Sequence, residues 1–183
     1  MSPAVFIDRD GTIVEEVGYL NHVSRFRMYP FVAGAIRRLN EARLPVIVIT
    51  NQSGVGRGYF PESFVQTVHQ LMTQQLAAAG AHLEGIYYCP HTPADGCDCR
   101  KPKLGMLERA CREHALDLRR SFVVGDRYLD MDLAQRAGAR GILVRTGYGE
   151  GELAWHAAQW PRQPDFVAED LAGAAEWILR QTK

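Results

Sequence analysis

The chain has 183 residues, and its 21 Lys and Arg residues balance its 21 Asp and Glu residues. The length suits a single α/β domain over residues 1–183 with a sizeable core. The balanced charge disfavours nucleic acid and anionic membranes as partners, and no apolar run approaches the roughly 20 residues of a membrane span. The chain begins Met-Ser-Pro and enters an apolar run without the charged start of a signal peptide, so we expect a soluble, cytoplasmic protein. We also expect a monomer.

Strands and helices alternate through the first half of the chain. The predicted strands are apolar, β-branched runs, and the predicted helices carry apolar residues three or four positions apart. In chain order we predict a strand over 4–7, an irregular segment over 13–32, a helix over 33–43, a strand over 46–49, a helix between Pro61 and Gly80, and a strand over 86–88. The inward stripe of the long helix should comprise Phe64, Val68, Leu71, Met72 and Leu76, with His69 at the surface or in packing.

The same alternation continues in the second half. We predict a helix over 104–116, a strand over 121–124, a helix ending at Gly138, a strand over 141–144, loop and short helix over 146–164, an edge strand over 165–167 and a helix over 171–181 capped by Asp170. Alternating strands and helices favour a parallel sheet with helices on both faces. The predicted fold class is therefore α/β, a Rossmann-like three-layer arrangement.

Polar residues follow three of the predicted strands. Asp8 and Asp10 follow the first, Thr50 and Asn51 the second, and Asp126 the fourth. The carboxyl ends of parallel strands border one crevice, so these side chains should converge there. Carboxylates are ligands that Mg²⁺ prefers. The hydroxyl of Thr50 and a lysine from the loop at 100–103 can stabilise the negative charge of a transferring phosphoryl group. The set therefore predicts phosphoryl transfer through an aspartyl-phosphate.

A calcium loop beginning at Asp8 is a poor alternative. Such a loop needs Gly at its sixth position and Glu at its twelfth, where this chain has Ile13 and Tyr19. A second alternative, a strand ending in a solvated Asp-Gly turn, is disfavoured by the other polar strand ends.

Four potential zinc ligands lie within eleven residues. Cys89, His91, Cys97 and Cys99 make a Cys₃His set, a composition typical of tetrahedral zinc sites. The alternative is a group of free thiols with a surface histidine. Thiolates are soft ligands and carboxylates are hard, so two different metals are predicted: a structural Zn²⁺ in this loop and a catalytic Mg²⁺ at the aspartates. Cys111 should be a core residue.

The order of these residues resembles that of the haloacid dehalogenase (HAD) superfamily of phosphatases. The resemblance rests on Asp8-Arg-Asp10-Gly-Thr, Thr50-Asn51, Lys101 and Gly-Asp126-Arg-Tyr-Leu-Asp130. It implies that Asp8 attacks phosphorus and that Asp10 protonates the leaving oxygen and then activates water. It also implies that Thr50 and Lys101 steady the phosphoryl group, and that Mg²⁺ is held by Asp8, the Asp10 carbonyl and Asp126.

Three further residues leave alternatives open. Lys103 competes with Lys101 for the lysine role, and we choose Lys101 because it follows the cysteine loop at once, as in the subgroup described next. Asp130 either hydrogen-bonds around the metal or lies on an exposed helical turn. His22 lies in a loop near the site, where it either contacts substrate or is a surface residue.

The intervals from Asp10 to Thr50 and from Thr50 to Lys101 have no room for a separate cap domain, so loops must close the crevice. A capless HAD phosphatase with this cysteine loop is similar to two subgroups, the D-glycero-D-manno-heptose 1,7-bisphosphate 7-phosphatases and the histidinol-phosphate phosphatase domains. Likeness to the first implies release of the C7 phosphate of a sugar bisphosphate, a step toward ADP-heptose for lipopolysaccharide or a related glycan. It implies substrate contacts at Glu16, Val17, Gly18, Tyr19, Thr50, Asn51, Gln52, Ser53, Arg100, Lys101 and Arg127.

Two other classes of function are weaker hypotheses. A phosphate-binding module without turnover is disfavoured because every catalytic position is filled. A phosphatase for nucleic-acid ends is disfavoured because the charge is balanced and no basic tract is present.

Overall fold

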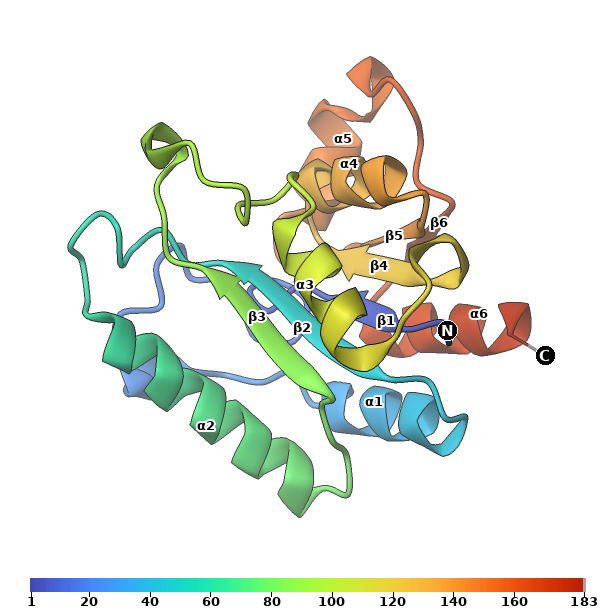
Figure 1. The fold of residues 1–183 in the computed structure, drawn as a ribbon, viewed down its shortest axis with the longest axis horizontal. Coiled ribbons are helices and arrows are strands. Elements are labelled where there is room, and N and C mark those ends of the chain that lie inside the picture. The colour runs from blue at the N-terminus through green and yellow to red at the C-terminus, as the bar shows by residue number, and fades with distance from the viewer. Residues whose placement is uncertain (183) are drawn as a thin grey trace.

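The computed structural model describes residues 1–182 and is built around a six-stranded parallel sheet (Figure 1). The strands are β1 (Val5–Ile7), β2 (Val46–Asn51), β3 (Gly85–Cys89), β4 (Phe122–Gly125), β5 (Arg140–Val144) and β6 (Phe166–Ala168). Their order is β3-β2-β1-β4-β5-β6, with parallel pairing throughout. The predicted α/β class, the parallel sheet and the edge position of the last strand are confirmed.

The central strand β1 lies between β2 and β4. Its residues Val5, Phe6 and Ile7 pair with Val46–Val48 on one side and with Phe122–Val124 on the other. The chain builds outward from β1 through β2 and β3, then returns to its other side with β4. This reversal of strand order creates a crevice at the carboxyl ends of β1 and β4, the place where ligands bind in open α/β sheets.

Helices cover both faces of the sheet. The helices are α1 (Val32–Glu41), α2 (Glu62–Ala78), α3 (Gly105–His114), α4 (Tyr128–Ala137), α5 (Gly149–Trp155) and α6 (Leu171–Gln181), with short 3₁₀ turns η1 (Val23–Arg25), η2 (Pro93–Asp95), η3 (Leu118–Arg120) and η4 (Ala157–Gln159). In Figure 1, α1, α2 and α6 lie below the sheet and α3 and α4 above it. The predicted three-layer arrangement is therefore confirmed.

The two faces of the sheet have separate apolar cores because strand side chains alternate. Val5 and Ile7 point into the core shared with α1, α2 and α6, whereas Phe6 points into the core shared with α3 and α4. Asp170 begins α6 as predicted, and its side chain accepts a hydrogen bond from the Gly173 N–H (3.0 Å).

The inward stripe of α2 differs from the sequence prediction. Its buried residues are Val65, Val68, His69, Met72 and Leu76. Phe64 and Leu71 only pack at the margin of the core. The helix is rotated relative to the predicted stripe, so it presents a histidine to the protein interior.

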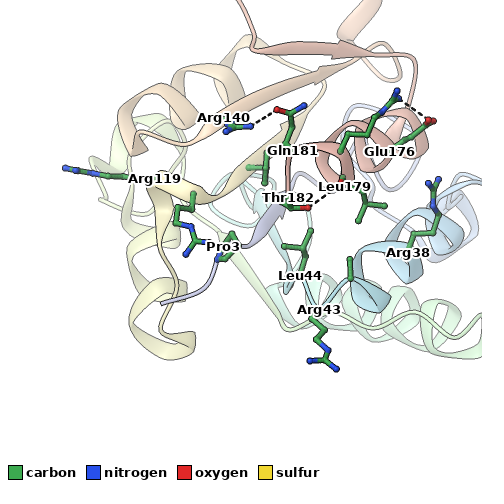
Figure 2. A pocket seen from close by; sticks show the side chains of 14 residues that line it. Pro3, Arg38, Arg43, Leu44, Arg119, Arg140, Glu176, Leu179, Gln181 and Thr182 are labelled. Carbon is green, nitrogen blue, oxygen red and sulfur yellow. Dashed lines mark hydrogen bonds and ion pairs between the residues drawn. The ribbon is translucent and has the colours of Figure 1, made fainter.

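The amino ends of the strands border a separate cavity of about 940 Å³ (Figure 2). It is far from the polar strand ends and is lined by six arginines, including Arg38 in the last turn of α1 and Arg180 in the last turn of α6. Cations are favourable at helix carboxyl ends, which gather at this edge of the sheet. In the described part of the chain, no helix has the length and apolar character that a membrane crossing requires.

Candidate active site

The polar residues predicted at the strand ends do meet in one cleft. Asp8 directly follows β1, Thr50 is the second-last residue of β2, and Asp126 directly follows β4. Together with Lys101 from the loop before α3, they line a cavity of about 260 Å³. All four are almost completely buried as residues. Between β1 and β2 the chain supplies only η1 and α1, and between β2 and β3 only α2, so loops rather than a separate domain border this cleft.

Lys101 is the cation at the centre of this cleft. Its Nζ lies 3.0 Å from Asp8 Oδ1 and 2.6 Å from Asp130 Oδ1, and its side chain is only 2% exposed. Burial alone would lower the pKa of Lys101, but the charges of Asp130 and Asp8 raise it above its ordinary value. The ammonium group therefore stays charged beside Asp8.

The neighbouring residues explain why Lys101 rather than Lys103 occupies the cleft. Asn51 at the end of β2 accepts a hydrogen bond from the Lys101 N–H (3.0 Å) and donates one to the Lys101 carbonyl (3.3 Å). Lys103 is half-exposed and donates to the carbonyls of Gly96 and Cys97 instead. The side chain of Asn51 thus holds the backbone that presents Lys101.

Asp126 and Asp130 join Asp8 in a cluster of three buried carboxylates. One oxygen from each lies within 4.8 Å of the others. Among the described residues, Asp126 Oδ1 and Asp130 Oδ2 have no hydrogen-bond partner although both are buried. Buried acceptors are nearly always satisfied. Of the two alternatives for Asp130, the exposed helical turn is wrong, because the residue is 1% exposed and pairs with Lys101.

The carboxylate cluster fits a divalent cation. Burial and the charges of Asp8 and Asp130 raise the pKa of Asp126 to about 8, and burial raises the pKa of Asp8 to about 7 although Lys101 opposes the shift. A hard cation would relieve this concentration of negative charge and occupy the unsatisfied oxygens. Gly11 and Gly147, both at positive φ, approach Asp126 so closely that a Cβ on either would collide with its carboxylate. Positions 11 and 147 therefore require glycine if the Asp126 carboxylate is to keep its place.

Asp10 faces the same cleft from a different direction. Its carboxylate accepts hydrogen bonds from Gln52 Nε2 (2.8 Å) and from Arg9 Nη2 (2.9 Å to Oδ2). Gln52 Nε2 also donates to Thr50 Oγ1 (2.8 Å). Asp10 is 21% exposed at its side chain, and Gln52 links it to the threonine predicted to contact the phosphoryl group.

Most of the predicted substrate-binding residues line the cleft, and two sequence candidates do not. Lining residues from the predicted set are Glu16, Gly18, Tyr19, Thr50, Asn51, Gln52, Ser53, Arg100, Lys101 and Arg127. Val17 lies outside the lining, and its carbonyl accepts a hydrogen bond from Arg25. His22 is exposed, begins η1 and contacts Ser24 rather than the cleft.

Sequence reasoning missed several residues of the site. Arg57, Leu129 and Tyr148 also line the cleft, and the Tyr148 N–H donates to Asp126 Oδ2 (2.8 Å). Tyr148 lies in the segment that follows β5, and its ring stacks under the guanidinium of Arg127 at 4.8 Å. Since β5 is another parallel strand, the rule that strand ends border the crevice also covers this segment. The sequence predicts only loop and short helix over 146–164 and indicates no site residue there.

The second predicted metal site is also assembled. Cys89, His91, Cys97 and Cys99 place one ligand atom each within 4.8 Å of one another. The Cys89–Cys97 and Cys97–Cys99 sulfur pairs lie 3.6 and 3.5 Å apart, and His91 Nδ1 lies 3.3 Å from Cys99 Sγ. A tetrahedron with Zn–S bonds of about 2.3 Å has edges of about 3.8 Å, so the four atoms have the spacing of a zinc site. No two cysteines in the described part of the chain form a disulfide. Cys111, predicted as a core residue, is only partly buried and packs at the margin of the core beneath α3.

The Cys₃His loop, residues 89–99, leads directly into the cleft. Arg100 follows Cys99, lines the cleft and donates to the His91 carbonyl (3.2 Å). The loop therefore fixes the start of the segment that carries Arg100 and Lys101.

Comparison with known proteins agrees with this geometry. Residues 98–174 match the family model described as HAD-hydrolase-like. The D-glycero-D-manno-heptose-1,7-bisphosphate 7-phosphatase of Thermosynechococcus vestitus is 45% identical over 96% of this chain and 95% of its own length. The Escherichia coli D-glycero-beta-D-manno-heptose-1,7-bisphosphate 7-phosphatase is 39% identical over 99% of this chain and 96% of its own.

A solved structure extends the likeness to three dimensions. The D,D-heptose 1,7-bisphosphate phosphatase of B. bronchiseptica, complexed with magnesium and phosphate, superposes with a TM-score of 0.89 and 35% identity, covering 98% of this chain and 99% of that one. Sequence identity at this level along nearly the whole of both chains shows that the proteins belong to one family, and not only that they share a fold. The chain belongs to the heptose-1,7-bisphosphate 7-phosphatase family of HAD-like phosphatases.

Proposed function

We propose that this protein is a Mg²⁺-dependent phosphoric monoester hydrolase that releases the C7 phosphate of D-glycero-D-manno-heptose 1,7-bisphosphate and leaves the 1-phosphate. The observation that carries the proposal is the buried cluster of Asp8, Lys101, Asp126 and Asp130 at the carboxyl ends of β1 and β4. The relatives that match nearly the whole chain are named for this substrate and this phosphate.

The reaction follows from the positions of the two N-terminal aspartates. In the first half, an Asp8 carboxylate oxygen bonds to phosphorus while the bond from phosphorus to the C7 oxygen breaks, and Asp10 gives its proton to that oxygen. In the second half, Asp10 takes a proton from water, the water oxygen bonds to phosphorus, and the bond to Asp8 breaks. Inorganic phosphate leaves and both aspartates return to their starting state.

Three other residues support the phosphoryl group. Lys101 lies 3.0 Å from Asp8, so its charge would stabilise the phosphoryl oxygens during transfer. Thr50 would donate its hydroxyl to the same group. The sequence predicts Asn51 as a substrate contact, but its side chain hydrogen-bonds the N–H and the carbonyl of Lys101. Its proposed role is therefore to position that lysine.

Mg²⁺ fits the carboxylate cluster beside Asp8. Asp8, Asp126 and the backbone carbonyl of Asp10 would hold it, and Asp130 would orient Lys101 and complete the surroundings. The metal would supply positive charge to offset the negative charge of the phosphoryl oxygens. Zn²⁺ would occupy the Cys₃His loop with all four positions filled by protein, which makes its role structural.

The sugar and its second phosphate would lie among the loops of the cleft. Arg100 and Arg127 are the predicted cations there, and Arg57 is a third that the structure adds. The cleft-lining residues Glu16, Gly18, Tyr19, Gln52 and Ser53, together with Val17 outside the lining, complete the proposed substrate-binding set. Of these, Val17 would act through the backbone turn that it shares with Gly18. We also propose that residues 1–183 form one domain that works as a monomer in the cytoplasm.

Phosphorus NMR tests the proposed function directly. Incubating the protein and Mg²⁺ with the 1,7-bisphosphate should remove the C7 resonance and leave the C1 resonance. Parallel kcat/KM measurements with each anomer, with histidinol phosphate and with phosphorylated DNA ends should favour the heptose bisphosphate. A higher kcat/KM for histidinol phosphate, or early loss of the C1 signal, would overturn the proposal.

A further inference from the structure

A buried histidine lies behind the proposed general acid. His69 is on the inward face of α2, is 7% exposed, and does not line the cleft. Its Nε2 lies 3.2 Å from Nη1 of Arg9, and its ring meets Tyr88 edge-on with centroids 5.5 Å apart. A polar ring in an apolar helix face costs stability unless it has a specific partner, and here the partner is Arg9.

Arg9 connects this histidine to the active site. Its guanidinium is 2% exposed and donates to the Asp10 carboxylate through Nε (3.3 Å to Oδ1) and Nη2 (3.1 Å to Oδ1 and 2.9 Å to Oδ2). The opposite nitrogen, Nη1, points at His69. The three side chains form one continuous chain, His69–Arg9–Asp10, that runs from the core of α2 to the cleft.

The direction of the outer hydrogen bond fixes the state of the histidine. Arg9 can only donate, so His69 Nε2 must accept and the proton of the neutral ring must be on Nδ1. Burial and the charge of Arg9 lower the pKa of His69 to about 3, which agrees with a neutral ring. The acceptor is therefore present throughout the pH range in which a cytoplasmic phosphatase works.

We propose that His69 is a positioning residue for proton transfer: it fixes the plane of the Arg9 guanidinium and, through it, the orientation of the Asp10 carboxylate. The inference rests on the general acid role proposed for Asp10. Three N–H groups, two from Arg9 and one from Gln52, already occupy the Asp10 oxygens, so little freedom remains for the carboxylate. Without an acceptor, the buried Nη1 would turn away to find one and would take the Asp10 carboxylate with it.

The leaving group separates this role from simple packing. A sugar alkoxide is a poor leaving group and needs the proton of Asp10, whereas p-nitrophenolate leaves without one. The ratio kcat/KM reports only the steps up to departure of the leaving group, so it isolates the acid step from the later attack of water. Poor placement of Asp10 should therefore reduce kcat/KM for a sugar phosphate far more than for p-nitrophenyl phosphate.

The experiment compares His69→Leu, which has no acceptor, with His69→Gln, whose carbonyl can accept the same N–H. Val65→Ala, a buried cavity mutation on the same helix, is the matched control for lost packing. His69→Leu should lower kcat/KM for the heptose bisphosphate by about tenfold to a hundredfold, and for p-nitrophenyl phosphate by less than about threefold. His69→Gln and Val65→Ala should stay within about threefold of wild type on both esters.

Three results would each overturn the positioning role. They are an equal loss of kcat/KM on the two esters in His69→Leu, no loss in His69→Leu, and a loss in His69→Gln as large as that in His69→Leu. If His69→Leu does not fold, His69→Ala removes the acceptor with a smaller side chain and takes its place. Failure of the proposed substrate is distinguishable, because the wild-type protein would then not hydrolyse the heptose bisphosphate. In that case the heptose bisphosphate is replaced in the comparison by a sugar phosphate that the wild-type protein does hydrolyse.

Discussion

Replacing Asp126 by Asn should stabilise the metal-free protein while abolishing its activity. Asp8, Asp126 and Asp130 bring three carboxylates together with one buried cation, Lys101. Asparagine has the same shape, its carbonyl can accept from the Tyr148 N–H as Asp126 Oδ2 does, and its amide can donate toward the neighbouring carboxylates. The variant removes a buried group that must either carry a charge or take up a proton in the metal-free fold. It also places an amide donor where Asp126 Oδ1 has no partner among the described residues.

The size of the effect follows from the pKa of Asp126. Burial and the neighbouring carboxylates raise that pKa from 3.8 to about 8. At pH 7 the unfolded state has an ionised Asp126, whereas the folded state must keep it protonated. This difference lowers the free energy of unfolding by about 4 kcal/mol at most. Asp8 shares part of this repulsion and remains in the variant, so we expect a gain of about 1–3 kcal/mol. For a chain of this size that is a rise in Tm of roughly 3–9 °C.

The assay is thermal unfolding with EDTA and with excess Mg²⁺, at several pH values. The raised pKa means that the folded state retains a proton that the unfolded state releases, so wild-type stability without metal should fall as pH rises from about 4 to about 8. Asp126→Asn should weaken this pH dependence of stability. It should also lose most of the stabilisation that we expect Mg²⁺ to give the wild type. Asp132→Asn, on the same helix but paired with Arg136 near the surface, is the control and should change little. A metal-free Asp126→Asn protein that is less stable than wild type would refute the electrostatic reasoning.

Three further predictions test the remaining parts of the site. Asp8→Asn should abolish turnover with the fold intact, and Asp10→Asn should lower kcat about 10²–10⁴-fold; Asp8→Asn activity within tenfold of wild type would rule out the covalent mechanism. Elemental analysis should find about one tightly held zinc per chain, and Cys97→Ser should lower both Tm and substrate affinity, whereas a protein purified without chelator and free of zinc would contradict the structural role. Arg100→Ala should raise KM for the bisphosphate far more than for p-nitrophenyl phosphate, and equal effects would remove Arg100 from the second phosphate.

The central part of the site could be predicted because it depends on a rule about sheets. Polar residues at the ends of parallel strands share one edge, so the meeting of Asp8, Thr50 and Asp126 required only the strand assignments. The same rule would also have indicated the segment around Tyr148 after β5. Tyr148 donates to Asp126 through its backbone N–H, a contact that no side-chain type in the sequence indicates.

Residues whose role depends on a partner from another element were harder to predict. Asp130 lies four residues after Asp126, in the first turn of α4, and the sequence alone leaves it either buried or exposed. The partner that decides between the two is Lys101, which comes from a loop 29 residues earlier. His69 is a similar case. The sequence leaves it at the surface or in packing, and the rotation of α2 and the buried guanidinium of Arg9 decide between the two.

The choice between Lys101 and Lys103 shows how backbone restraints can select one of two equivalent side chains. Both lysines have the charge and reach for a phosphoryl group, so composition cannot separate them. The structure restrains Lys101 from two sides: Cys99 of the Cys₃His loop precedes it by two residues, and Asn51 of β2 holds both its N–H and its carbonyl. Lys103 lies beyond these restraints, and its ammonium turns back to the carbonyls of the loop. Adjacency to the Cys₃His loop is therefore the informative signal, because restraining that loop also restrains the first residues that follow it.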